Sequence, residues 1–230
     1  MLITTQYTKD YQHKADLLSE SIAKYWPGRY EPILFEPEQC KSYRKDWPKN
    51  RPSYASMQAG EFVDLIDCPE DEIIICLDAD TVMQRAFELN ELQSIYNSLD
   101  PEPGLSGYGI LSVFGAYPAT PLFQVRNNLG VVLGKVPDKQ ELKTLHQLEF
   151  TASFVIAKKS TFREIGVWFN NNLDTMTQLT GHHAATQLLI NELCYLITKV
   201  GILPKTFQCG SWYDGCTEED AKNAIFNHTK

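Results

Sequence analysis

The stretch Ile73-Ile74-Ile75-Cys76-Leu77-Asp78-Ala79-Asp80 decides the fold of this 230-residue chain. Five apolar residues in a row, shortly after the turn-forming Pro69-Glu70-Asp71, are typical of a strand buried on both faces at the centre of a sheet. The segments before it alternate between expected strands and helices, namely strand 2–5, helix 11–25, strand 33–35 and helix 53–66. This alternation predicts an α/β fold, in which helices flank a central sheet that is mixed but mostly parallel.

The rest of the chain has weaker periodicity but completes the same kind of fold. Helix 11–25 has an apolar face, because Ala15, Leu18, Ile22 and Tyr25 recur at spacings of three and four. Further on, we expect strands at 130–133 and 150–157, and helices at 87–99, from Ser160 through Phe169, and at 182–200 with Gly201 ending the last one. No internal repeat or linker interrupts the pattern, so we predict a single domain over residues 1–230.

Composition narrows the class of protein and its partners. The hydrophobic fraction of 43% indicates a folded globular chain, and the net charge of −8 disfavours nucleic acid as a partner. The N-terminus lacks a signal-peptide pattern and no apolar run approaches the ~20 residues of a membrane span, so we expect a cytoplasmic protein. The six cysteines are irregularly spaced, which favours reduced thiols; a metal site at Cys209 and Cys216 is the less favoured alternative.

Asp78 and Asp80 are the sharpest chemical signal. If the strand geometry persists, both carboxylates lie on one side of the chain at the carboxyl edge of a parallel sheet, where ligands bind in α/β folds. An Asp at a strand end can also be a turn former or helix cap. However, two neighbouring like charges beside a buried strand repel each other, and a cation relieves that repulsion. Carboxylate oxygens suit Mg²⁺ or Mn²⁺, so we predict a metal site here.

An apolar strand followed by Asp-x-Asp resembles the signature of glycosyltransferases with the Rossmann-like GT-A fold. In that family the motif binds a divalent ion, usually Mn²⁺, that bridges the diphosphate of a nucleotide-sugar. The resemblance implies Asp78 and Asp80 as metal ligands, with Asp78 also able to contact the ribose. It also implies a third ligand, His228, because Ile225-Phe226-Asn227-His228 matches the position of a C-terminal histidine in such enzymes.

The same resemblance assigns the rest of the expected site. Residues 1–100 would bind a UDP- or GDP-sugar and residues 101–230 a glycan or small-molecule acceptor. Further donor contacts are expected from Thr5, Tyr7, Arg51, Ala79, Ser153 and Lys230. Arg51 belongs to the densest basic cluster of an acidic chain, which suits a diphosphate. If the reaction inverts the anomeric centre it needs a carboxylate base, for which Glu149 and Asp174 are candidates.

Two other functions remain open from the sequence. A phosphohydrolase of the haloacid dehalogenase type also places Asp-x-Asp-x-Thr/Val after an apolar strand, a pattern that Asp78-Ala79-Asp80-Thr81-Val82 satisfies, and would use Asp78 as its nucleophile. Against it, that motif normally lies near the N-terminus, whereas here strand–helix units precede it. The second alternative is a nucleotide- or sugar-binding relative that keeps the fold without catalysis. The sequence leaves the donor sugar, the acceptor, the stereochemistry and the oligomeric state open.

Overall fold

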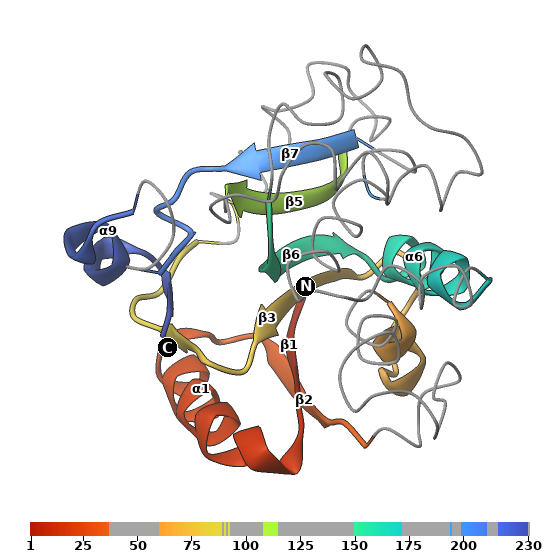
Figure 1. Ribbon diagram of the computed structural model, residues 1–230, viewed down its shortest axis with the longest axis horizontal. Coiled ribbons are helices and arrows are strands. Elements are labelled where there is room, and N and C mark those ends of the chain that lie inside the picture. Colours follow the sequence, from red (N-terminus) through yellow and green to blue (C-terminus); the bar gives the residue numbers. More distant parts are fainter. Residues whose placement is uncertain are drawn as a thin grey trace, which may run out of the picture.

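The computed structural model describes residues 1–36, 60–88, 90, 92, 108–114, 150–171, 194, 199–210 and 216–229 (Figure 1). Within these residues, a six-stranded sheet runs in the order β2-β1-β3-β6-β5-β7. The strands are β1 (Leu2–Tyr7), β2 (Arg29–Leu34), β3 (Ile73–Asp78), β5 (Tyr108–Phe114), β6 (Phe150–Lys158) and β7 (Lys199–Leu203). β6 runs antiparallel to both of its neighbours and the other strands are parallel. The expected mixed, mostly parallel sheet is confirmed.

A second, smaller sheet lies beyond the carboxyl end of β3. In the described part of the chain it has three strands in the order β4-β9-β8: β4 (Thr81–Met83), β8 (Gln208–Cys209) and β9 (Phe226–His228). The helices whose bounds the structure describes are α1 (Gln12–Tyr25), α6 (Lys159–Asn171) and α9 (Glu218–Asn223), with 3₁₀ helices η1 (Lys9–Tyr11) and η3 (Glu61–Leu65). Because β4 follows β3 after one turn, the small sheet is attached directly to the Asp-x-Asp motif.

Helix α1 packs between the two sheets through the face that the sequence predicts. Ala15, Leu18 and Ile22 are buried, and the last two share a core cluster with Ile75 of the large sheet and Phe226 of the small one. Residues spaced by three and four lie on one side of a helix, so a single apolar face of α1 packs against both sheets. Figure 1 shows α1 on the opposite side of the large sheet from α6 and η3.

The α6 side of the sheet depends on a close approach between backbones. A Cβ added to Gly60, just before η3, would lie 1.8 Å from the carbonyl oxygen of Phe162 on α6. The rings of Phe62 and Phe162 meet edge to face at 5.1 Å. The buried ammonium of Lys159 donates to the carbonyl oxygens of Ile66 (2.6 Å) and Cys68 (2.9 Å), which ties the start of α6 to the segment after η3.

Two predicted helices differ from the structure. The described end of helix 53–66 is the short 3₁₀ helix η3, which begins after Gly60 at the contact with α6. Helix 182–200 is wrong at its C-terminal end, because residues 199 and 200 open strand β7 and Gly201 lies inside that strand. Parallel pairing with β5 satisfies this backbone and overrides the helical spacing of the apolar residues. The expected strand 130–133 lies outside the described residues.

The cysteine prediction also needs correction. Cys209 and Cys216 form a disulfide, with Cα atoms 6.6 Å apart, whereas Cys68, Cys76 and Cys194 are free as expected. Cys209 ends β8 and Cys216 lies just before α9, so the bond links the small sheet to the start of that helix. Among the described residues, the helices are too short or too polar for any of them to cross a membrane.

Candidate metal centre

Strand β3 delivers the two acids to the carboxyl edge of the large sheet. Asp78 is the last residue of the strand, and Ala79 and Asp80 form the turn into β4. The side chain of Asp78 is 44% exposed, whereas that of Asp80 is 21% exposed. Asp80 is therefore the more enclosed carboxylate and Asp78 the one open to a ligand.

Pairing of β4 with β9 brings His228 to these acids. Thr81 and His228 are opposite each other in the antiparallel ladder, so their side chains share a face of the small sheet. The backbone N–H and the hydroxyl of Thr229 both donate to the carbonyl oxygen of Asp80, at 2.8 and 2.7 Å. These contacts fix the turn that carries Asp80 against the strand that carries the histidine.

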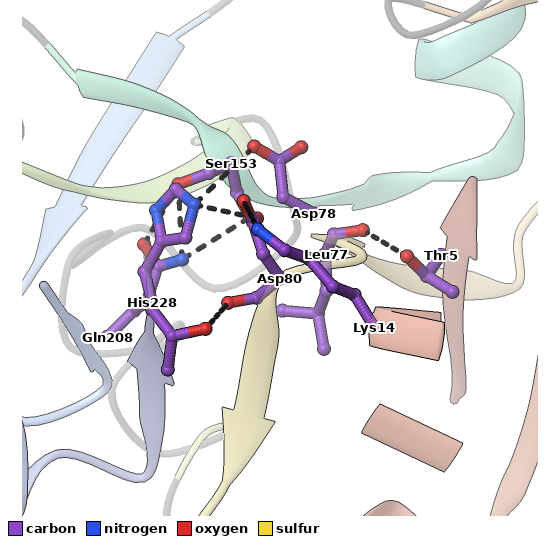
Figure 2. Close-up of polar contacts among 9 residues, drawn as sticks. Thr5, Lys14, Leu77, Asp78, Asp80, Ser153, Gln208 and His228 are labelled. Carbon is purple, nitrogen blue, oxygen red and sulfur yellow. Dashed lines mark hydrogen bonds and ion pairs between the residues drawn. The ribbon is translucent and has the colours of Figure 1, made fainter. Parts of the chain in front are cut away.

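The three side chains form one compact cluster (Figure 2). His228 is only 6% exposed, and its Nε2 lies 2.9 Å from Oδ1 of Asp80 and 3.9 Å from Oδ2 of Asp78. One ligand atom from each of Asp78, Asp80 and His228 lies within 4.8 Å of the others. Two carboxylates and one imidazole are donors that a divalent cation such as Mn²⁺ accepts, so the residues present fit the expected metal.

The small sheet that holds His228 is linked to α9 by polar contacts. The amide nitrogen of Gln84 donates to the carbonyl oxygens of Ala221 (2.7 Å) and Ala224 (3.1 Å) at the end of α9. Helix α9 begins with a reciprocal capping box between Thr217 and Asp220. Gln84 thus ties the end of β4 to the segment between α9 and β9, while β9 itself pairs with β4 on one side and β8 on the other.

A cation of the protein itself also reaches this cluster. Nζ of Lys14, on α1, lies 3.4 Å from Oδ2 of Asp80. Burial raises the pKa of Asp80, but the hydrogen bond and charge of His228, together with the charge of Lys14, outweigh burial and leave this pKa below its usual value. Asp80 is therefore held in the ionised form that a metal ligand requires.

The other expected donor contacts are placed as follows. Thr5 is buried, and its hydroxyl donates to the carbonyl oxygen of Leu77 at 2.8 Å, which ties β1 to β3. Tyr7 ends β1, and Ala79 is buried within the turn between the two acids. Ser153, on β6, is buried and accepts from the amide of Gln208 at 3.1 Å, on the His228 side of the cluster in Figure 2. Arg51, Glu149, Asp174 and Lys230 lie outside the described residues.

Two residues of the centre were not identified from sequence. Lys14 precedes Leu18 by four positions and Leu18 precedes Ile22 by four, so a lysine begins the buried row of α1. A charge on an otherwise apolar row is the signal that could have found it. Gln208 lies between Phe207 and Cys209, and all three are buried, so a polar side chain within a short apolar run is the corresponding signal there.

Comparison with known proteins places this geometry in a familiar fold. No family model and no curated protein matches the sequence. Among solved structures, the galactosyltransferase LgtC in complex with donor and acceptor sugar analogs is 12% identical, with a TM-score of 0.54 over 100% of this chain and 87% of that one. Mouse xyloside xylosyltransferase 1 is 13% identical, with a TM-score of 0.55 over 98% of this chain and 96% of that one.

A third solved structure is a glycosyltransferase involved in the glycosylation of the major capsid of PBCV-1. It is 14% identical, with a TM-score of 0.57 over 99% of this chain and 91% of that one. At such identities the likeness concerns the fold, and it extends over nearly the whole of both chains. The chain therefore has the GT-A fold of glycosyltransferases, with an Asp-x-Asp motif and a histidine gathered at the carboxyl edge of its sheet.

Proposed function

We propose that this protein is a metal-dependent glycosyltransferase that moves a sugar from a nucleotide-diphosphate donor to an acceptor hydroxyl. The observation that carries the proposal is the convergence of Asp78, Asp80 and His228 within 4.8 Å at the carboxyl edge of β3. In open α/β sheets this edge is where ligands bind. The similarity of the whole chain to solved glycosyltransferases supports the same reaction class.

Each residue of the centre has a task that follows from its exposure and partners. Asp80 and His228 are enclosed and held by β4 and β9, so they would hold a Mn²⁺ or Mg²⁺ ion. Asp78 is the more exposed acid and would contact both the ion and a ribose hydroxyl of the donor. A bound divalent ion would supply positive charge that offsets the negative charge developing on the departing diphosphate.

The remaining parts of the proposal follow from the sequence. Residues 1–100 would form the donor half of a single domain and residues 101–230 the acceptor half. Thr5, Tyr7, Ala79 and Ser153 would line the donor site, while Arg51 and Lys230 would contact the diphosphate. Glu149 and Asp174 are the proposed candidates for a general base if the anomeric centre is inverted. The donor would be a UDP- or GDP-sugar, and the acceptor a glycan or small molecule.

The two alternatives receive less support. A phosphohydrolase would use Asp78 as its nucleophile, but the three solved structures compared above are glycosyltransferases. A binding protein without catalysis would keep the same cluster, so only turnover separates it from an enzyme.

The test is nucleotide release from UDP- and GDP-sugars in the presence of Mn²⁺, measured for wild type, Asp80→Asn and Asp71→Asn. Asp71 is exposed and precedes the opposite end of β3, so its variant is a control for loss of an acid near the same strand. We expect Mn²⁺-dependent release by wild type and Asp71→Asn, and a loss of about 100-fold or more in Asp80→Asn. Metal-dependent phosphate release from a generic phosphomonoester, abolished by Asp78→Asn, would favour the phosphohydrolase. Binding of donors without any turnover would favour the non-catalytic protein.

A further inference from the structure

The ammonium of Lys14 is a built-in cation beside the candidate metal centre. Its Nζ lies 3.4 Å from Oδ2 of Asp80, while Nε2 of His228 lies 2.9 Å from Oδ1 of the same carboxylate (Figure 2). The carboxylate thus has a different partner at each oxygen. The side chain of Lys14 is only 25% exposed, so its charge is less screened than that of a surface lysine.

Two features hold Lys14 in this place. It begins the row of Leu18 and Ile22 on the buried face of α1, and α1 starts at the carboxyl end of β1, so the side chain reaches the edge where β3 ends. Its Nζ also lies 5.3 Å from the ring centroid of Tyr11, which is a cation–π contact. Lys14 therefore has both an anionic and an aromatic partner at the site.

The charges around this lysine determine what it does to ligands. Asp78 and Asp80 together carry two negative charges, and Lys14 offsets one of them, so the metal-free centre attracts a divalent cation less strongly than the two acids alone would. The same ammonium attracts an anion that approaches the acids. A unit positive charge about 6 Å from a divalent cation repels it by about 1.4 kcal/mol even at the dielectric constant of water. That energy weakens the binding of the cation about tenfold.

We propose that Lys14 is a counter-ion for Asp80 that weakens binding of the bare divalent cation and strengthens binding of the anionic donor. The inference rests on the proposed function, because it requires a cation and a nucleoside diphosphate at this edge. The consequence is that the cation and the donor bind together. At a given cation concentration, the wild-type protein without donor binds little metal, and most of the metal binds along with the diphosphate.

Other roles for Lys14 predict different changes in ligand affinity when the lysine is removed. If Lys14 only oriented Asp80 for the metal, its removal would weaken cation binding, as loss of a supporting partner usually does. If Lys14 only stabilised the fold, its removal would weaken both ligands or neither. Opposite changes in the two affinities are expected only when the charge of the ammonium acts on ligands of opposite sign.

The experiment measures two dissociation constants for the metal-free protein. One is for Mn²⁺ alone, followed by the electron paramagnetic resonance signal of free Mn²⁺, and the other is for UDP and GDP alone, followed by calorimetry. Lys14→Met keeps the apolar stem and removes the charge, and Lys14→Arg keeps the charge. Lys24→Met is the matched control, because Lys24 lies on the same helix over the ring of Tyr25 at 4.7 Å and is exposed.

We expect Lys14→Met to bind Mn²⁺ about tenfold more tightly and the nucleoside diphosphate several-fold more weakly, with Lys14→Arg and Lys24→Met close to wild type. Mn²⁺ binding that is unchanged or weaker in Lys14→Met, in a variant that unfolds at the wild-type temperature, overturns the inference and leaves the proposed function standing. Failure of wild type to bind Mn²⁺ with or without a nucleoside diphosphate overturns both.

Discussion

Oδ1 of Asp80 and Nε2 of His228 lie 2.9 Å apart although 148 positions separate the two residues in the sequence. The contact joins the turn after β3 to the strand β9, and the antiparallel ladder between β4 and β9 fixes it. The two residues therefore belong to one centre although they come from distant parts of the sequence. Removing either should disable the centre without removing the sheet that carries it.

The histidine gives the first prediction. His228→Asn should weaken Mn²⁺ binding by at least about tenfold, since even the loss of a residue that only supports a metal ligand has an effect of that size. Calorimetric titration with Mn²⁺ in the presence of UDP or GDP measures it. His13→Asn, at an exposed position on α1, is the control and should bind as wild type does. Equal affinities for the two variants would remove His228 from the centre.

The close approach of Gly60 to α6 gives the second. In Gly60→Ala the new Cβ would lie 1.8 Å from the carbonyl oxygen of Phe162, and backbone atoms yield less easily than the end of a side chain. We expect a loss of about 2 kcal/mol or more in the free energy of unfolding, from urea denaturation with an unchanged m-value. Leu65→Ala, at the last residue of η3 and 47% exposed, should change the free energy of unfolding by well under about 1 kcal/mol. A Gly60→Ala protein as stable as wild type would mean that η3 and α6 are not in contact in solution.

The disulfide gives the third. Cys209 and Cys216 are separated by 7 positions. Closing such a loop lowers the conformational entropy of the unfolded chain, which stabilises the folded protein by about 2 kcal/mol. Thermal unfolding with and without a phosphine reductant should show a lower midpoint for the reduced protein. Cys216→Ala should unfold near the temperature of the reduced wild type and should not respond to the reductant. A midpoint that reductant leaves unchanged in wild type would show that the bond does not stabilise the fold.

Tyr30 gives a pH dependence. Burial raises the pKa of its hydroxyl from 10.0 to about 12, against the opposing effect of a hydrogen bond from Ser19. Because the folded protein holds this proton more tightly, the stabilisation is complete below pH 10 and is lost as pH rises from 10 to 12. Since Tyr30 is only half-buried, we expect a loss of about 1 to 2 kcal/mol, reduced by solvent screening from the full shift.

Tyr30→Phe isolates this effect. Its free energy of unfolding, from urea titrations across the same range, should fall less steeply with pH than that of wild type. The difference between the two curves is the contribution of Tyr30. Parallel curves between pH 10 and 12 would mean that the hydroxyl titrates normally in the folded protein.

The parts of the fold that follow from sequence are those decided by local periodicity. The apolar row of α1 lies on one buried face of a single helix, and the apolar run before Asp78 forms a single buried strand. Both elements are where the sequence pattern predicts them. The two acids could be assigned to a cation because like charges beside a buried strand need one. His228 was reached only through resemblance to a family, since a three-residue strand has too few positions to show a period.

The errors arise where distant pairing determines the structure. Residues 199 and 200 continue a helical spacing, yet they join β7 because β5 offers them a parallel partner. Lys14 reads as part of an ordinary helix until α1 is placed beside the end of β3. The pairing of Cys209 with Cys216 depends on how close the end of β8 lies to the start of α9, which the spacing of the cysteines in the sequence does not show.

The ladder between β4 and β9 has a consequence for biosynthesis. A ribosome that has released the first 200 residues has already delivered both acids and the lysine, but strand β4 still lacks its antiparallel neighbour. Translation must reach residue 228 before the imidazole can close around the carboxylates. The candidate centre is therefore incomplete until β9 has been made, and a metal ion held by all three side chains would bind only late in synthesis of the chain.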